Sequence, residues 1–140
     1  MFVLIVGAGR VGSTIARLAL AAGHEVSVLD EDPLSHERLD EGQTTSWEDA
    51  GGRFTVGHAI EIEALEEAGI NEADVFIAST NGDNTNLVIA QIAQRKFEVD
   101  RVIVRVMDPA RASWYSHQGL HTICPTSAAI AEFKTALEIS

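Results

Sequence analysis

After Met1 the chain reads Phe2-Val3-Leu4-Ile5-Val6-Gly7-Ala8-Gly9-Arg10-Val11-Gly12. The first five of these residues form a continuous apolar run, which is typical of a strand buried on both faces of a parallel sheet. The remaining six fit the pattern G-x-G-x-x-G, in which a tight turn leads from such a strand into a helix. This order of residues predicts the first half of a βαβ unit that binds a nucleotide.

The residues that follow complete the unit. A helix is predicted over residues 13–22, with apolar residues at helical spacing from Val11 onward, and Gly23 stops it. A second strand over residues 25–29 then leads to Asp30. The alternative is an ordinary glycine-rich turn. Strand, loop, helix, strand and acid agree here in order and spacing, which favours nucleotide binding.

Each glycine of the motif has a predicted role. Gly7 allows the tight turn after the strand, Gly9 lets the backbone approach a phosphate, and Gly12 lets the helix pack closely on the strand. The helix N-terminus offers free N–H groups and a positive dipole end to the phosphates. Asp30 lies about 20 residues after the motif, where an acid accepts hydrogen bonds from an adenosine ribose. Because its carboxylate repels a 2′-phosphate, we expect an NAD-type or adenine nucleotide rather than NADP.

Length and composition limit the class of protein. With 140 residues, 46% of them hydrophobic and 22% charged, the chain is expected to be a single soluble domain over residues 1–140. No apolar run reaches the ~20 residues that cross a bilayer, and the N-terminus lacks the pattern of a signal peptide. We therefore expect a cytosolic protein. The single cysteine, Cys124, forms no internal disulfide and is expected in the core.

The charge balance narrows the possible ligands. A formal net charge of −11 argues against a nucleic-acid surface, which needs a basic patch to displace counterions. The five histidines show no metal-ligand spacing, so no metal site is expected. An anionic ligand must instead be held by backbone amides, a helix dipole and a few arginines.

Strand and helix patterns alternate along the rest of the chain. Short strands are predicted at 54–56, 74–78, 102–106 and 122–124, and helices at 34–39, 60–68, 85–96, 109–117 and 126–137. Residues 41–52 are expected to form a polar loop with an exposed Trp47. Six strands that alternate with six helices predict an α/β, doubly wound Rossmann-type fold, with a parallel six-stranded sheet in the order 3-2-1-4-5-6 and helices on both faces.

Candidate ligand residues collect at the carboxyl ends of the predicted strands. Ser79 and Thr80 follow the fourth strand, beside the point where the strand order reverses. Arg105 ends the fifth strand on the same edge, where it either neutralises ligand phosphates or pairs with Asp108. Asn84 and Asn86 are each either a cap or turn residue or a direct contact. The predicted nucleotide contacts are Gly7, Ala8, Gly9, Arg10, Val11, Gly12, Asp30, Glu31, Gly57, His58, Ala59, Ser79, Thr80, Asn81, Asn84 and Arg105.

The order of motifs resembles the N-terminal RCK domain (regulator of K+ conductance), also called TrkA-N or KTN. The resemblance covers essentially all 140 residues. It is carried by Gly7-Ala8-Gly9-Arg10-Val11-Gly12, Val28-Leu29-Asp30-Glu31-Asp32, Leu65-Glu66-Glu67-Ala68-Gly69-Ile70-Asn71-Glu72-Ala73-Asp74, Gly82-Asp83-Asn84-Thr85-Asn86, Arg105-Val106-Met107-Asp108-Pro109 and Ile123-Cys124-Pro125. Each motif alone is weak, whereas their order is rather specific.

The resemblance implies a regulatory subunit rather than an enzyme. Such a subunit binds NAD(H), ATP, ADP or AMP and controls a membrane-embedded potassium channel or transporter, at the cytoplasmic face of the membrane and without inserting into it. The resemblance also implies a homodimer or larger ring in which the last helix exchanges between subunits, with Ile130, Phe133 and Leu137 at the interface and Arg10 reaching a phosphate across it. The alternatives are the cofactor-binding part of an NAD-dependent oxidoreductase and a nucleotide sensor for another process.

Two departures from the family pattern are visible. The family usually carries Gly-Asp-Ala after the third strand, whereas this chain has Gly57-His58-Ala59. A histidine in place of that acid changes the charge offered to the adenine or ribose. Many members also continue into a small C-terminal RCK domain, whereas this sequence ends at Ser140.

Overall fold

The sheet at the centre of the structure has six parallel strands in the order β3-β2-β1-β4-β5-β6. The structure is a computed structural model that describes residues 1–140. The strands are β1 (Phe2–Val6), β2 (Glu25–Asp30), β3 (Arg53–Val56), β4 (Val75–Ala78), β5 (Arg101–Arg105) and β6 (His121–Ile123). This topology confirms the predicted doubly wound fold. Because β1 lies between β2 and β4, the strand order reverses beside β1, and a crevice forms at the carboxyl ends there.

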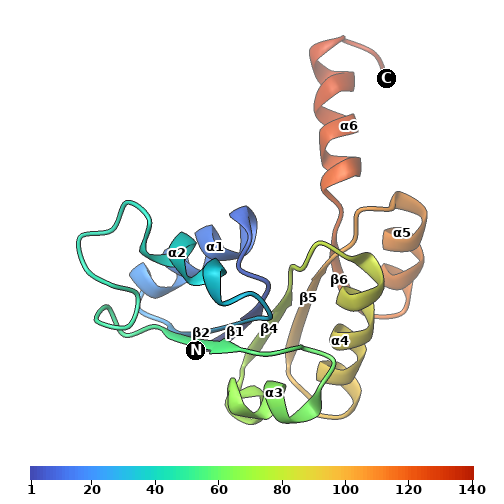
Figure 1. Ribbon diagram of the computed structural model, residues 1–140. Coiled ribbons are helices and arrows are strands. Elements are labelled where there is room, and N and C mark those ends of the chain that lie inside the picture. The colour runs from blue at the N-terminus through green and yellow to red at the C-terminus, as the bar shows by residue number, and fades with distance from the viewer.

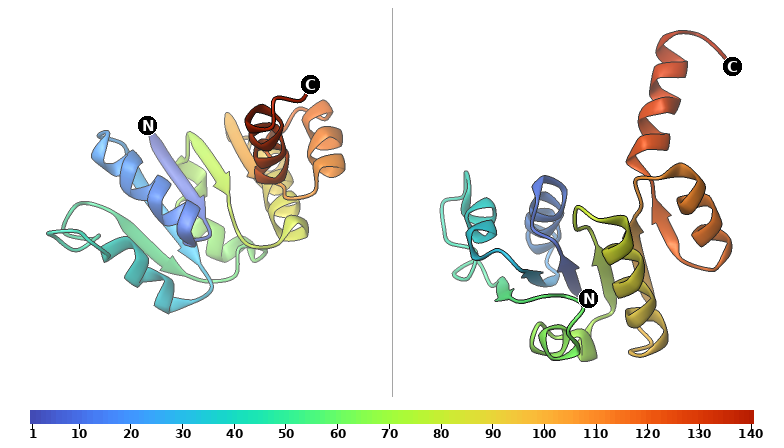
Figure 2. Two further views of the ribbon diagram at one scale, coloured as in Figure 1. Left: turned by 90° about the horizontal axis from the view of Figure 1, so that it is seen from above. Right: turned by 45° about the vertical axis from the view of Figure 1, so that its right-hand side comes forward.

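Helices cover both faces of the sheet (Figure 1). They are α1 (Arg10–Ala21), α2 (His36–Asp40), α3 (Ile62–Glu67), α4 (Asp83–Arg95), α5 (Pro109–His117) and α6 (Pro125–Ala136), with short 3₁₀ turns at Pro33–Ser35 and Ile70–Glu72. Helices α1 and α2 lie on one face of the sheet and α3 and α4 on the other, as the two views of Figure 2 show. Each predicted helix is present, with ends shifted by a few residues.

The two faces of the sheet have separate hydrophobic cores because successive side chains of a strand point to opposite sides. On β1, Val3 and Ile5 belong to a cluster of 9 buried residues under α1 and α2. Leu4 and Val6 belong to a cluster of 20 buried residues under α3, α4 and α5. This double burial explains the uninterrupted apolar run at the start of the sequence.

Helix α1 contacts the sheet through small residues. Its buried residues are Gly12, Ser13 and Ala16. The residues whose spacing predicted the helix lie elsewhere on its surface, since Val11, Ile15 and Leu18 are 38–61% exposed. The helix was therefore predicted correctly, but small side chains let its backbone approach the sheet, with Leu20 packed against the edge of the smaller core, whereas Val11, Ile15 and Leu18 are largely turned to the surface.

The loop between α2 and β3 contains the clearest error of the sequence analysis. Trp47 was predicted to be exposed, yet it is only 2% exposed and belongs to the smaller core. Its Nε1 donates a hydrogen bond to the carbonyl oxygen of Arg53 at 2.9 Å. A Cβ on Gly52 would lie 2.1 Å from the indole ring, so a glycine is needed there. The polar composition of residues 41–52 predicted an exposed loop, but Trp47 attaches this loop to the rest of the domain.

Helix α6 extends away from the body of the molecule (Figure 1). None of its residues is buried, and Ile130, Phe133 and Leu137 are 51–69% exposed. Cys124 precedes this helix and is half-buried rather than fully in the core, and its Sγ accepts a hydrogen bond from the N–H of Ser127. No helix in the structure has the length and apolarity needed to cross a membrane.

Candidate functional site: a cleft at the switch point of the sheet

A cleft of about 400 Å³ opens at the carboxyl ends of β1, β2 and β4. It lies where the strand order reverses, the usual ligand position in an open α/β sheet. Nine predicted residues line it: Gly7, Gly9, Asp30, Glu31, Gly57, Ala59, Ser79, Thr80 and Asn81. Seven other residues complete the lining, namely Val6, Leu29, Asp32, Ser35, Arg38, Gly82 and Thr85. The other predicted residues, Ala8, Arg10, Val11, Gly12, His58, Asn84 and Arg105, do not line this cleft.

The three motif glycines have different surroundings. Gly7 has φ +100°, and a Cβ there would lie 2.6 Å from the carbonyl oxygen of Ser79 on the next strand. A Cβ on Gly12 would lie 1.8 Å from the carbonyl oxygen of Gly7. A Cβ on Gly9 would meet nothing within 4 Å. Gly7 and Gly12 are thus needed for the fold itself, whereas Gly9 borders open space that a ligand can fill.

The N-terminus of α1 faces the cleft without a capping side chain. Gly9 is its N-cap residue and makes no side-chain hydrogen bond. The first turn of a helix has N–H groups without intrahelical partners, and a negatively charged ligand satisfies them. Together with the open space at Gly9, this arrangement fits the phosphates of a nucleotide.

Asp30 is fixed at the end of β2 by the backbone. Its Oδ2 accepts a hydrogen bond from the N–H of Ala8 at 2.7 Å, and its Oδ1 accepts one from the N–H of Asp32 at 2.9 Å. An ionised carboxylate has about four acceptor positions. Two of them orient the group, and the other two remain for ligand hydroxyls. The acid is therefore placed before any ligand arrives.

The hydroxyl groups after β4 are used inside the protein. Ser79 is buried, and its Oγ is in donor position to the carbonyl oxygens of Val6 and Gly7 at 3.1 and 3.2 Å. Thr80 Oγ1 donates to Oδ1 of Asn86 at 2.6 Å. Both residues lie beside the cleft as expected, but their side chains hold β4 to its neighbours.

Asn86, for which the sequence left a cap or turn role and a direct contact open, has a structural role. It is 1% exposed. Its Nδ2 donates to the carbonyl oxygens of Thr80 at 3.1 Å and of Arg105 at 3.0 Å, and its Oδ1 accepts from the N–H of Thr80 at 2.9 Å. The side chain thus joins the ends of β4 and β5. A buried asparagine in the first turn of a helix carries no distinct sequence signal.

Arg105 takes neither of its two predicted roles. Its guanidinium donates to the carbonyl oxygen of Thr80 and does not line the cleft. It also forms no ion pair with Asp108, which instead caps α5 by accepting from the N–H of Arg111 at 3.1 Å. Asn84 accepts from Arg111 at 2.8 Å. These residues hold the β5–α5 connection against α4.

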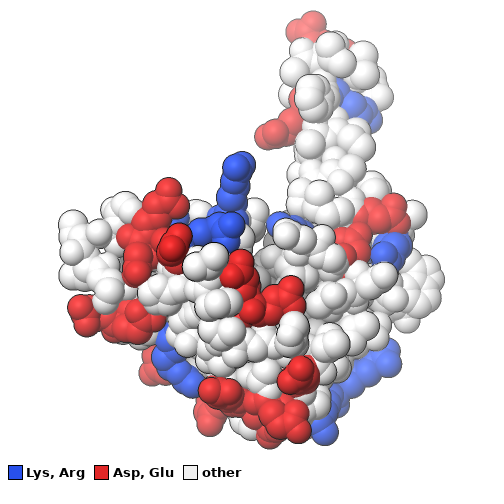
Figure 3. Space-filling view, in the orientation of Figure 1, with Lys and Arg blue, Asp and Glu red and all other residues white.

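Arg38 is the basic residue of the cleft lining, and the sequence analysis missed it. It lies on α2, with Nη1 3.3 Å from Oγ of the buried Ser35 and 3.4 Å from the carbonyl oxygen of Ala8. It forms no ion pair with Asp30 or the other acids of the lining. Figure 3 shows acidic side chains spread over this side of the molecule with a few basic ones between them. Its place on the short helix that follows Asp30 is the only signal in the sequence that points to it.

His58, which replaces the usual acid of the family, lies at the rim. Its Nδ1 is 2.8 Å from Oε2 of Glu31, and both side chains are largely exposed. The pair therefore joins the loop after β3 to the end of β2 above the cleft.

Comparison with protein families matches residues 3–125 to the TrkA-N domain. The chain belongs to the TrkA-N family. It is 40% identical over 123 residues to the Trk system potassium uptake protein TrkA of Streptomyces coelicolor, covering 88% of this chain and 52% of the relative. It is 33% identical over 130 residues to a TrkA homolog of Methanothermobacter thermautotrophicus, covering 92% of this chain and 56% of that protein. The chain thus spans about half the length of these curated relatives.

Solved structures of the same fold include other TrkA-N and RCK domains. The TrkA-N domain of the inner membrane protein ybaL from Escherichia coli has a TM-score of 0.77 at 23% identity, covering 97% of this chain and 95% of that one. The Kef C-terminal domain of Shewanella denitrificans in its AMP-bound form has a TM-score of 0.76 at 24% identity, with 99% and 80% covered. The GsuK channel bound to NAD has a TM-score of 0.76 at 20% identity, with 98% and 23% covered. These similarities confirm the Rossmann-type fold of the TrkA-N domain.

Proposed function

We propose that this TrkA-N domain binds NAD(H) or an adenine nucleotide in the cleft and thereby regulates potassium transport. The observation that carries the proposal is the pairing of an uncapped helix N-terminus beside open space at Gly9 with the fixed carboxylate of Asp30. The first group suits phosphates and the second suits ribose hydroxyls. The relatives named as potassium uptake proteins and the related structures with bound AMP or NAD support the same ligand class and process.

Under this proposal most of the predicted contact residues lie around the nucleotide, and two of them act indirectly. Gly9 and the N-terminus of α1 hold the phosphates on a turn that Gly7 and Gly12 keep in place, Asp30 and Glu31 hold the ribose, and Gly57 and Ala59 border the adenine. Asn81 lines the far side of the cleft with Ser79 and Thr80. Asn84 and Arg105 act indirectly, by holding the segments beside β4 and β5.

We infer that the domain acts by binding rather than by catalysis. No histidine, cysteine or lysine lines the cleft, and its carboxylates collect at the end of β2. A bound nucleotide changes the state of an assembly only if it binds one state more tightly than the other. The proposed assembly is a homodimer or ring formed through α6, on the cytoplasmic side of a membrane-embedded potassium channel or transporter.

A calorimetric titration with NAD+, NADH, ATP, ADP and AMP, together with light scattering, tests the proposal. Micromolar binding of one nucleotide by an oligomer is the expected result. Absence of binding by all five would refute the nucleotide assignment. Capture of a potassium transporter subunit by the full-length protein that carries this domain tests the process, and failure of that capture under nucleotide-saturated conditions would favour a sensor for another process.

A further inference from the structure

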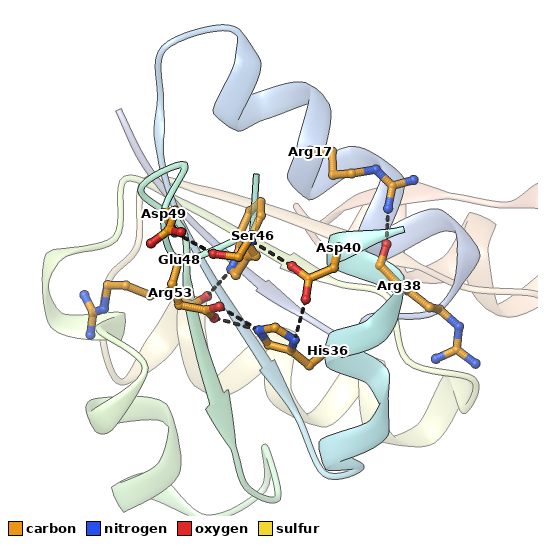
Figure 4. A network of polar contacts seen from close by, with 9 residues as sticks. Arg17, His36, Arg38, Asp40, Ser46, Glu48, Asp49 and Arg53 are labelled. Carbon is orange, nitrogen blue, oxygen red and sulfur yellow. Dashed lines mark hydrogen bonds and ion pairs between the residues drawn. The ribbon is translucent and has the colours of Figure 1, made fainter. Parts of the chain in front are cut away.

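A second group of polar side chains lies on the side of α2 that faces the loop 41–52 (Figure 4). His36 stands between two carboxylates. Its Nδ1 is 3.3 Å from Oδ2 of Asp40, one turn along the same helix, and its Nε2 is 2.7 Å from Oε2 of Glu48 in the loop. Nothing in the proposed nucleotide site uses these three residues.

Both contacts of His36 are hydrogen bonds at the same time only when each ring nitrogen carries a proton. Only the imidazolium form donates from both ring nitrogens, whereas neutral imidazole has one N–H and turns a lone pair toward the other carboxylate. Apart from the two carboxylates, His36 faces the ring of Phe54 on β3, with ring centroids 5.2 Å apart. No lysine or arginine pairs with either acid, since all three ion pairs of the structure involve a histidine. Histidine is the side chain whose charge ordinarily changes between pH 5 and 8.

The same three residues offer ligand types that suit a divalent metal, and their ligand atoms lie within 4.8 Å of one another. Their directions argue against that role. Asp40 lies at one ring nitrogen and Glu48 at the other, so the lone pairs of the three residues do not meet at one point. An imidazolium that donates one N–H to each carboxylate fits this geometry better than a metal ion.

The group fixes the loop to α2. Oδ1 of Asp40, the oxygen not used by His36, accepts a hydrogen bond from the N–H of Trp47 at 2.8 Å. Trp47 is buried, and it anchors the loop through its bond to Arg53. His36 therefore links the helix to the loop at Glu48, one residue beyond this anchor.

The opposite side of the same short segment lines the nucleotide cleft. Ser35 and Arg38 flank His36 within three residues and both border the cleft, while Leu39 is buried beneath them. Helix α2 has only 5 residues, and Arg17 of α1 donates to the carbonyl oxygen of Arg38. A helix this short takes most of its stability from its packing, so a change in its contact with the loop also changes the placement of Arg38.

We propose that His36 is a proton-dependent positioning residue. Its protonated form holds α2 and the loop 41–52 together and fixes Arg38 at the cleft. Loss of the proton leaves two carboxylates without a cation, loosens the loop, and weakens binding of a nucleotide. The last of these effects rests on the proposed function, whereas the loosening of the loop does not.

Fluorescence of Trp47 tests the first effect without any ligand. A Trp114→Phe background makes Trp47 the only tryptophan. We expect its emission to shift to the red as the pH rises from 5.5 to 8.5, and we expect a much smaller shift in His36→Gln and in Glu48→Gln. His117→Gln is the matched control, because His117 bonds to Ser113 within α5, and it should respond like the background chain. An equal response in His36→Gln, or no response at all, would refute the proposal. Circular dichroism at each pH shows that every variant stays folded.

Two further arms separate the remaining explanations. At pH 7.5, a change of Trp47 emission on adding Zn²⁺ or removing metal with a chelator would overturn the proton-dependent role in favour of a metal site. The second arm is calorimetry with NADH in a His58→Gln background, so that His36 is the histidine that remains beside the cleft. We expect affinity to fall about two- to fivefold from pH 5.5 to 8.5, the range for a partly exposed ion pair, and to stay flat with His36→Gln. A flat profile in both would refute the coupling. Absence of NADH binding at every pH would refute the proposed function and leave the Trp47 result standing.

Discussion

The ends of β1 and β4 lie side by side at the cleft, yet the backbone groups that follow them have different hydrogen-bond partners. After β1, the N–H of Ala8 bonds to Asp30, and the N-terminus of α1 has no capping side chain. After β4, both polar groups of the Thr80 backbone bond to Asn86. The carboxylate of Asp83 likewise accepts from the N–H groups of Met107 and Asp108. The N–H groups in the first turn of α1 have no capping side chain, whereas after β4 both backbone groups of Thr80 are hydrogen-bonded, although α4 likewise begins at Gly82 without a capping side chain. Proximity to a cleft thus does not identify a binding residue, but an unsatisfied group does.

The largest loss of stability is expected at Gly12, where α1 packs against the end of β1. Gly12→Ala places a Cβ 1.8 Å from the carbonyl oxygen of Gly7, and neither backbone can move without separating α1 from β1. We expect a loss of at least about 3 kcal/mol in the free energy of unfolding, measured by urea denaturation. Gly9→Ala is the matched control, since its Cβ meets nothing within 4 Å. That variant should stay folded but bind a nucleotide more weakly, and equal destabilisation by both would contradict the division of roles.

The second prediction concerns Asn86, the side chain that bonds to the backbone at the end of β4. Asn86→Ala removes the partner of the half-buried N–H of Thr80 and of the carbonyl oxygen of Arg105, while the carbonyl oxygen of Thr80 keeps the guanidinium of Arg105. Each unsatisfied buried group costs about 1–3 kcal/mol, so we expect a loss of about 2–4 kcal/mol in stability by the same measurement. Asn84→Ala removes only an exposed contact to Arg111 and should cost less than about 1 kcal/mol. Comparable costs for the two asparagines would show that the end of β4 does not depend on Asn86.

The third prediction concerns the open strand end as a ligand site. Asp30→Ala removes the carboxylate that Ala8 and Asp32 orient, and we expect adenosine binding to weaken by about 1–3 kcal/mol in titration calorimetry. Glu31→Ala removes the same charge from the exposed rim, where the loss should be below about 1 kcal/mol. Unchanged affinity in Asp30→Ala would refute the proposal that Asp30 binds the ribose.

The smallest effect on stability is expected far from both strand ends, in α6. Phe133→Ser replaces an exposed side chain that contributes nothing to either core, so unfolding should change by less than about 0.5 kcal/mol. If α6 carries the subunit interface, the same variant should lower the mass measured by light scattering. A large loss of stability without a change in mass would place Phe133 inside the fold instead.

Regular patterns made the frame of the fold predictable from the sequence. The apolar run before Gly7, the glycine motif and Asp30 indicate the position of the cleft, and the alternation of strands and helices along the chain indicates the strand order. What escaped prediction depends on contacts between segments distant in the chain. In the sequence Trp47 is surrounded by polar residues, and only the structure shows that it packs in the smaller core. Arg38 faces the cleft only because α2 folds back over the glycine loop.

The same limit applies to the choice between ligand residue and structural residue. The sequence placed Ser79 and Arg105 at the correct edge of the sheet, because parallel strands end together. It gave no information on which carbonyl oxygen each side chain would reach, since the acceptors lie on other strands. Hydrogen-bond partners therefore need the coordinates, whereas positions along an edge follow from the topology alone.

The ion pairs of this protein have a consequence for its response to ionic strength. Every one of them involves a histidine, so the net charge of −11 is not relieved by any arginine–carboxylate or lysine–carboxylate pair. Acidic groups that repel one another destabilise a compact chain, and mobile cations screen that repulsion over a distance of about 8 Å at 0.15 M salt. We therefore expect the folded chain to become more stable as monovalent salt rises.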